Sequence, residues 1–485
     1  MALIGENGYV AISNIERTLG LTPATGMVRV VEALSCALDL NKAYTPSAAL
    51  SAGRGVRNSV ITTTTREGSV PCESVPLSAI GTQLYAAFGE MTDIGTLSTG
   101  SVVNTTLDGA VLKGAATIKL TDDSKSANGK IYQIGTGRNA ECVKQVGEAA
   151  AGVVTLEYQT RFAHADGEAV KEVEAPFTHY YYRTDEADLP SFTLDKNIGG
   201  KFGQRFKGCR VNTFSMTGNV DETINFDFAL ISTAFAKLIA EADKASKLVA
   251  SGTATSTVAF ELNDSAGGFL TQVTAPLSNY VVHNGDTGKI SYISAVNSNT
   301  KLTLQNDIIK SGDNYSIYSA DYMLTTTEYD ALRSKLDSFT FQQGSITKDG
   351  SAFGCVPSFT FTLNNNLNAG KCLGSGDNLG RLTALRANVE FNFDLEYKDE
   401  TEFEAYQDGD TAALILTFTH DSEIIPGEKY AMSLHIPKYK KTAAPAPIQE
   451  GILVSSITGQ ALYDSVCGYD VRMSLKDGVY TYPIE

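Results

Sequence analysis

Apolar and polar residues alternate strictly along several short stretches of the chain. The clearest stretch is 389–397, where every second residue is apolar and the residues between are polar or acidic. The same alternation recurs at 224–230 and 469–475. A period of two predicts β-strands with one face on a core and the other toward water. Four acidic residues occupy outward positions on these strands: Asp227, Glu390, Asp394 and Glu396.

Helical periodicity is limited to a few segments. Ser78–Phe88 places apolar residues at a spacing of four, Ser232–Val249 is rich in Ala and Lys, and Asp399–Gln407 is short and acidic. These patterns predict three helices attached to a mainly β structure.

The order of predicted elements occurs twice in the chain. Segment 36–89 runs strand, Gly/Ser-containing loop, two strands and helix, and segment 358–409 repeats that order with similar spacing. Two further strands follow each helix, and we expect Val211–Gly218 to correspond to Ile452–Gly459 and Ile224–Leu230 to correspond to Tyr469–Leu475. A repeated order of elements predicts a duplicated domain.

Two stretches of short strands and polar turns interrupt the repeat and resemble each other. The predicted division is a discontinuous first domain at 1–97 and 173–248, and a second domain at 321–485. The inserted small β modules are then 98–172 and 249–320. The fold class is therefore mainly β, with two related sandwich or barrel domains, each with a flanking helix, and two inserted modules.

Composition and motifs argue against several functions. A net charge of −16 and a pI near 4.9 disfavour a protein that grips the nucleic-acid backbone, because such binding needs Lys and Arg. The seven Cys include no CxxC pair, and the five His stand singly, which favours neither a disulfide framework, a metal site nor a catalytic centre. We therefore expect no enzyme activity and no cofactor. The absence of an apolar span or signal pattern leads us to expect no membrane partner and synthesis in a reducing cytoplasm.

Several segments together resemble tail tube proteins of tailed bacteriophages. The resemblance covers roughly 30–97, 176–235 and 325–480. The segments that carry it are Lys42–Thr45, Ser69–Glu73, Leu189–Lys196, Gly208–Met216, Phe359–Leu367, Thr401–Gly409 and Ala412–Thr417.

This resemblance implies a virion structural protein that forms stacked rings, the tail tube, through which DNA is ejected without specific binding. A chain with two fused copies would close as a trimeric, pseudo-hexameric ring. The long loop after the first strand of each copy would reach the adjacent ring, with Arg54 and Arg57 in one loop and Lys371 and Arg381 in the other. The four outward acids named above become candidates for an acidic lumen.

The implied partners are further copies of the chain, the tape measure, tail terminator and baseplate or tip proteins, and a sheath if the tail is contractile. The implied location is the virion tail, after synthesis in the host bacterial cytoplasm. An alternative interpretation is a capsid decoration protein or host-surface adhesin whose inserted modules bind carbohydrate or protein. That alternative predicts discrete particles that never stack.

Overall fold

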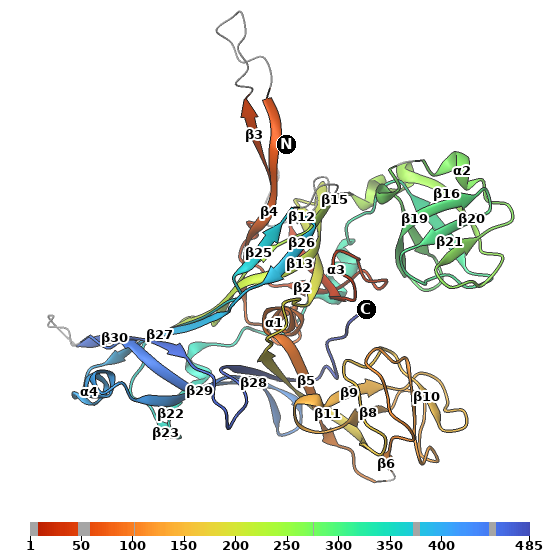
Figure 1. The fold of residues 1–485 in the computed structure, drawn as a ribbon. Coiled ribbons are helices and arrows are strands. Elements are labelled where there is room, and N and C mark those ends of the chain that lie inside the picture. The colour runs from red at the N-terminus through yellow and green to blue at the C-terminus, as the bar shows by residue number, and fades with distance from the viewer. Residues whose placement is uncertain (1–7, 47–58, 101, 275, 372–378, 446–452) are drawn as a thin grey trace, which may run out of the picture.

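The regular structure of the protein is mostly antiparallel β-strand (Figure 1). The structure is a computed structural model, and it describes residues 8–46, 59–100, 102–274, 276–371, 379–445 and 453–485. Within these ranges the α-helices are short: α1 Ile80–Phe88, α2 Phe269–Gln272, α3 Thr326–Leu332 and α4 Thr401–Gln407. The mainly β class predicted from alternation is confirmed.

One sheet, here called the long sheet, runs through both copies of the repeat. Its ladders join β3 to β4, then β14, β13, β24, β27, β30 and the end of β29. Their bounds are β3 Asp39–Pro46, β4 Ser59–Glu73, β13 Phe202–Asn219, β14 Asn225–Ile231, β24 Ser358–Asn364, β27 Asn388–Glu396, β29 Glu428–Ala443 and β30 Val454–Ala461. The ladder between β13 and β24 is where the first copy meets the second.

A second sheet also joins the two copies. Its ladders connect β5, β11, β31, the first part of β29, β28, β22 and β23 in that order. The bounds are β5 Gly89–Leu97, β11 Ala169–Arg183, β22 Gly344–Lys348, β23 Ser351–Ala352, β28 Thr411–Ile425 and β31 Arg472–Asp477. A third group lies beside the first part of β13: β1 Tyr9–Glu16, β2 Met27–Val31, β12 Ser191–Ile198 and β15 Ala234–Ile239. Hairpin β25 Leu367–Gly370 and β26 Arg381–Ala384 extends β24 and β27.

The main core lies between these sheets and draws residues from both copies. Its members include Phe214, Phe226 and Phe228 of the first copy and Phe361 and Phe391 of the second. All nine residues of α1 are buried in it. The two copies therefore share one core, as expected when strands from both halves form the same sheets.

The ladders show the duplication residue by residue. Asn41 pairs with Thr65 as Asn364 pairs with Asn388, and Tyr44 pairs with Ile61 as Leu367 pairs with Ala384. One offset of 323 residues therefore relates both strands of the first hairpin to their counterparts.

The later strands repeat as well, but the strands that correspond are not those predicted from the sequence. β30 pairs with β27 as β14 pairs with β4, so 454–460 corresponds to 225–231. The end of β29 then corresponds to β13, at an offset of 230, and a register shift falls at the equivalent place in both, between Val211 and Thr213 and between Lys441 and Ala443. The predicted match of 211–218 with 452–459 is therefore wrong, because alternation alone does not say which strand a segment pairs with.

The helix predictions met mixed outcomes. Ser78–Phe88 contains α1 and Asp399–Gln407 contains α4. Residues 232–249 form β15 and a 3₁₀ segment, Glu241–Lys247, so the helix predicted there is wrong. β15 pairs with β13, and Phe235 packs on Phe206 with ring centroids 5.6 Å apart. This ladder and ring contact outweigh the high helix propensity of Ala and Lys, because tertiary contacts override local propensity.

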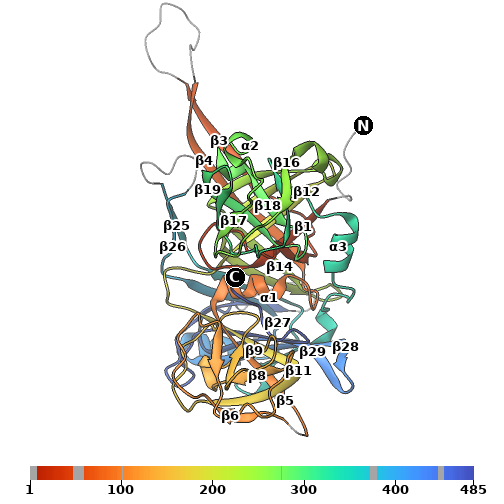
Figure 2. The same ribbon diagram turned by 90° about the vertical axis from the view of Figure 1, so that its right-hand side faces the viewer.

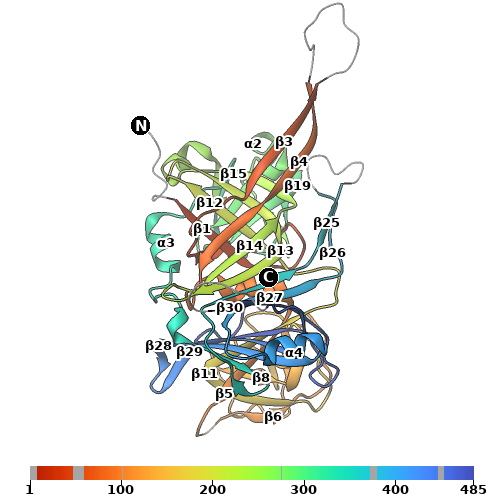
Figure 3. The ribbon, with the colours of Figure 1, turned by 90° about the vertical axis from the view of Figure 1, so that its left-hand side faces the viewer.

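Each inserted stretch has a hydrophobic cluster of its own. The first contains β6 Asn104–Thr106, β7 Thr117–Lys119, β8 Ile131–Ile134, β9 Glu141–Lys144 and β10 Val153–Thr155 around Tyr132 and Val154. The second contains β16 Leu248–Thr253, β17 Glu261–Asn263, β18 Val281–Asn284, β19 Ile290–Ser298, β20 Lys301–Leu304 and β21 Asn314–Tyr318, in one six-stranded sheet around Leu262 and Phe269. Figure 2 shows both on the side of the molecule that faces the viewer. Figure 3, from the opposite side, shows β4, β14 and β13 of the long sheet in front.

Candidate functional face

The outward positions of six neighbouring strands form one polar surface, here called the outer face of the long sheet. It consists of alternate residues of β4 (65–73), β14 (225–231), β13 (213–219), β24 (358–364), β27 (388–396) and β30 (454–460). Their neighbours in sequence, among them Phe226, Phe361 and Phe391, point into the core. At these described positions of the six strands there is no Lys, Arg or His, whereas Ser, Thr and Asn are frequent; the exposed Lys440 lies opposite Gln460 on the adjacent end of β29.

Six carboxylates lie on this face: Glu67, Glu73, Asp227, Glu390, Asp394 and Glu396. The last four are those selected from the sequence, and the fold brings them onto one sheet although they come from different copies. Sequence reasoning missed Glu67 and Glu73. The signal was present, because both alternate with the buried Val70 and Cys72 on β4.

Hydrogen bonds across the ladders hold several of these side chains in place. The Ser358 hydroxyl donates to Asp394 Oδ2 at 2.7 Å, and Ser456 donates to Asp394 Oδ1. Gln460 Nε2 of β30 donates to Asn388 Oδ1 at 2.8 Å, and within β27 Asn388 Nδ2 donates to Glu390 Oε1 at 2.6 Å. Such cross-strand pairs order a face that has no apolar packing of its own.

Asp227 is more enclosed than the other acids. It lies between Pro71 of β4 and Ser215 of β13, and its Oδ1 atom is buried without a hydrogen-bond partner among the described residues. Burial raises the pKa of this carboxyl group. Three of the other five carboxylates, Glu390, Asp394 and Glu396, lie together on β27, and Glu390 is exposed.

Of the four cationic residues predicted for inter-ring contacts, the two that the structure describes lie outside this face. Arg54 and Arg57 fall outside the described residues. Lys371 directly follows β25, Arg381 begins β26, and both side chains are exposed. Figures 2 and 3 show this hairpin and the β3–β4 hairpin extending toward the same end of the molecule.

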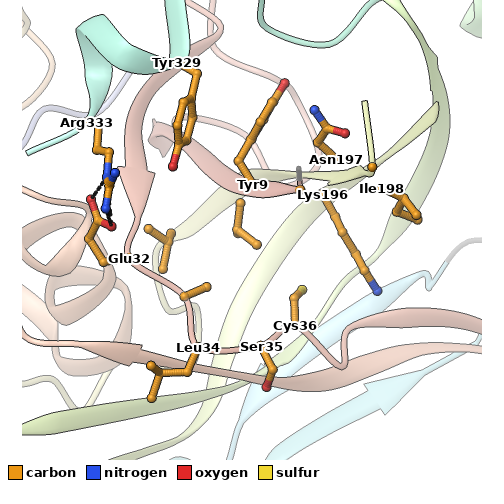
Figure 4. A pocket seen from close by; sticks show the side chains of 15 residues that line it. Tyr9, Glu32, Leu34, Ser35, Cys36, Lys196, Asn197, Ile198, Tyr329 and Arg333 are labelled. Carbon is orange, nitrogen blue, oxygen red and sulfur yellow. Dashed lines mark hydrogen bonds and ion pairs between the residues drawn. The ribbon is translucent and has the colours of Figure 1, made fainter. Parts of the chain in front are cut away.

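A pocket of about 570 Å³ lies between β1, β12, α3 and residues 31–36 (Figure 4). Tyr9 stacks on Tyr329 with ring centroids 5.2 Å apart, and Arg333 forms an ion pair with Glu32. Burial raises the pKa of the Cys36 thiol, which disfavours a reactive thiolate. The pocket therefore lacks an activated cysteine nucleophile.

The described parts of the chain contain neither a cluster of metal ligands nor a membrane-spanning helix. No group of three or more His, Cys, Asp or Glu side chains is placed to hold a metal ion. No helix in these parts has the length and apolar character needed to cross a membrane.

These features define a class of protein: a β-sheet building block that presents one continuous acidic face. The chain matches the family model described as phage tail tube protein over residues 5–291 and 312–461. It belongs to that family. No curated protein matches it. Family membership gives the chain a structural role, not an enzymatic one, in the tail of the virion, where it assembles with other tail proteins.

Proposed function

We propose that the chain polymerises as stacked rings into the phage tail tube and that the outer face of the long sheet lines its lumen. The observation that carries the proposal is the composition of that face. Its six carboxylates and lack of cations extend over strands of both copies. A solvated outer wall would have no physical need to exclude Lys and Arg, whereas a DNA channel does.

The physical basis is electrostatic. DNA carries one negative charge per about 1.7 Å of helix axis, and proteins hold it mainly through Lys and Arg. A surface of carboxylates and hydroxyls repels the phosphates and offers no cation to replace their counterions. The lumen residues of this proposal are Asp227, Glu390, Asp394 and Glu396, together with Glu67 and Glu73. DNA would slide past them during ejection.

The ring of this proposal contains three chains and therefore six copies of the domain. Support comes from the ladder between β13 and β24, which already joins one copy to the next inside the chain. Repeating that join between chains gives heterologous contacts that close when the rotation per copy is one sixth of a turn.

The division predicted from sequence belongs to the same proposal. The first tube domain comprises 1–97 and 173–248, the second 321–485, and the inserted modules 98–172 and 249–320. The separate hydrophobic clusters of the two modules support it. Contacts between rings would use the hairpin loops with Arg54, Arg57, Lys371 and Arg381 against acidic surfaces of the neighbouring ring. The tape measure, terminator, baseplate or tip proteins, and a sheath in a contractile tail, would complete the set of partners.

Electron microscopy of the concentrated, purified chain tests the tube. Hollow tubes with three chains per ring are expected, and particles that remain discrete even with a tail initiator present would instead favour a decoration protein or adhesin. The lumen assignment needs a second experiment. Tubes of the double variant Glu390→Lys, Asp394→Lys should retain DNA at low salt, whereas wild-type tubes and Glu390→Gln tubes should not. Equal retention by all three would place these residues outside the lumen.

A further inference from the structure

We propose that the ring closes through a ladder between β3 of one chain and the end of β29 of the next, with Asn41 opposite Ala443. This inference rests on the proposed ring assembly and adds which two edges meet and in what register. The partner is a second copy of this chain.

The ladder between β13 and β24 inside the chain is the model for the proposed ladder between chains. β13 and β24 pair from Thr213 opposite Asn364 to Asn219 opposite Ser358. Next to this ladder, the Leu367 N–H donates to Asn212 Oδ1 at 2.8 Å. The Ala384 N–H donates to the Ala187 carbonyl, also at 2.8 Å. The second hairpin is thus anchored at its base by the first copy.

The two residue offsets of the repeat, 323 and 230, give the equivalent pairing for the strands at the other two edges, β3 and the end of β29. The offset of 323 takes Asn364 back to Asn41, and the offset of 230 takes Thr213 forward to Ala443. Among the described strands, Asn41 of β3 pairs only with β4, and Ala443 of β29 pairs only with β30, whereas Tyr439 and Lys440 earlier in β29 also pair with β28. β3 therefore lies at one edge of the long sheet and the end of β29 at the other, as ring closure requires.

The side chains at the β29 edge resemble those at the equivalent edge of β13 in the internal ladder. Arg210 is buried and donates to the Leu382 carbonyl, and its counterpart Lys440 is also cationic but exposed. The counterpart of Asn212 is Thr442, whose hydroxyl can accept a hydrogen bond as the Asn212 side chain does. An equivalent donor and acceptor are therefore present at the end of β29, where the Thr442 hydroxyl also shares a hydrogen bond with the Thr458 hydroxyl at 2.8 Å.

Exposed apolar residues on the first hairpin, β3–β4, also indicate an interface with another chain. Tyr44 is 61% exposed and Ile61 is 42% exposed, and they face each other across the β3–β4 ladder. Their counterparts, Leu367 and Ala384, are half-buried where the hairpin lies against the first copy. An exposed pair of large apolar side chains is what an interface leaves uncovered in the separate subunit.

Cysteine cross-linking tests the register. The variant Asn41→Cys, Ala443→Cys would be made in a background with Cys36, Cys355, Cys372 and Cys467 changed to Ser, and assembled tubes would be oxidised mildly. Directly opposed residues have the Cα spacing that a disulfide needs. On a non-reducing gel we expect species of two and three chains and none larger, since three chains close the ring.

Three controls make the result decisive. Thr213→Cys, Asn364→Cys should give an intramolecular disulfide, because that pair is directly opposed in the chain. Asn41→Cys, Lys440→Cys, three residues out of register, should remain uncross-linked. Chains carrying only one of Asn41→Cys and Ala443→Cys should cross-link when mixed, and only to two chains.

The outcomes separate this inference from the function on which it rests. If wild-type and variant chains form tubes and the internal control closes, but Asn41→Cys, Ala443→Cys does not cross-link, the register is wrong and the tube stands. If the out-of-register control cross-links equally well, the register is also wrong. If the wild-type chain forms no rings or tubes under any condition, the proposed function fails and this inference fails with it.

Discussion

The helices α1 and α4 occupy the same place in the two copies but have opposite surroundings. Each follows the second strand of its hairpin, yet every residue of α1 is buried and no residue of α4 is. α1 is enclosed because other parts of the chain cover it. Gly81 lies against the Tyr482 ring, so close that a Cβ atom would be 2.0 Å from the ring. The two copies therefore share the order of their elements, but equivalent helices differ in burial and so in their contribution to stability.

Residues 477–485 form the covering segment and tie distant elements together. Their backbone pairs with β1, where the Glu485 N–H donates to the Ile15 carbonyl at 2.8 Å. Beneath them, Asp93 accepts from His179 Nδ1 at 2.7 Å and from Arg161 Nη2 at 2.5 Å, and Asp477 accepts from Tyr482. This buried network links the first copy, the first inserted stretch and the end of the second copy. The difference between α1 and α4 can be tested by substitutions in the buried network, in α1 and on the outer face of the long sheet.

The largest effect is expected for Asp93→Asn. The change leaves the Arg161 and His179 cations without their shared carboxylate in a fully buried site, which typically costs about 3–5 kcal/mol. The measurement is chemical unfolding of the purified chain, with Glu404→Gln on the exposed side of α4 as control. Losses of equal size in the two variants would contradict the importance given to the buried network.

A pH dependence should follow from the same network. The Asp477 and Asp93 carboxylates overcome desolvation and raise the pKa of His179 to about 9. The resulting stabilisation is fully present below the unfolded pKa of about 6.5 and is lost as the pH rises through 9, with a span of up to about 3 kcal/mol.

His435 in the second copy provides the contrast. Burial lowers the pKa of His435, so its contribution is lost as the pH falls. The unfolding free energy of the wild type should be lower at pH 9.5 than at pH 6. The difference between the two pH values should be much smaller for His179→Gln. An unchanged pH slope in His179→Gln would show that His179 is not responsible.

Gly81→Ala should destabilise the chain by about 1–3 kcal/mol through overpacking against Tyr482. The sign of the change in unfolding free energy is informative, because a Gly→Ala change within an ordinary helix is stabilising by roughly 1 kcal/mol. Thermal or chemical unfolding gives the value, and Tyr482→Ala supplies the matched background in which the penalty should disappear. A stabilising Gly81→Ala in the wild-type chain would mean that α1 is not packed as described.

The smallest effect is expected on the outer face of the long sheet. Glu390 is exposed and contacts Asn388, so Glu390→Gln should change the unfolding free energy by no more than about 0.5 kcal/mol. The same unfolding assay checks this. A loss of several kcal/mol would give Glu390 a role in stability and weaken the case that its charge serves the channel.

Local pattern predicted those features that depend on a residue and its near neighbours. Alternation along β27 and β14 identified strands and the outward acids Glu390 and Asp227, because a pleated strand directs successive side chains to opposite faces. The repeated order of strand, loop and helix revealed the duplication. The helices at 78–88 and 399–407 were found from periodicity and composition in the same way.

Tertiary structure decided which strands pair and which surfaces are covered. Alternation did not show that β30 takes the place of β14, that 234–239 joins the edge of β13, or that α1 is buried while α4 is exposed. It also did not show that Asp227 and Glu390 share one sheet, since β13 and β24, one strand from each copy, lie between theirs. The period of a strand is set by its own backbone, whereas ladder partners and burial depend on residues hundreds of positions away.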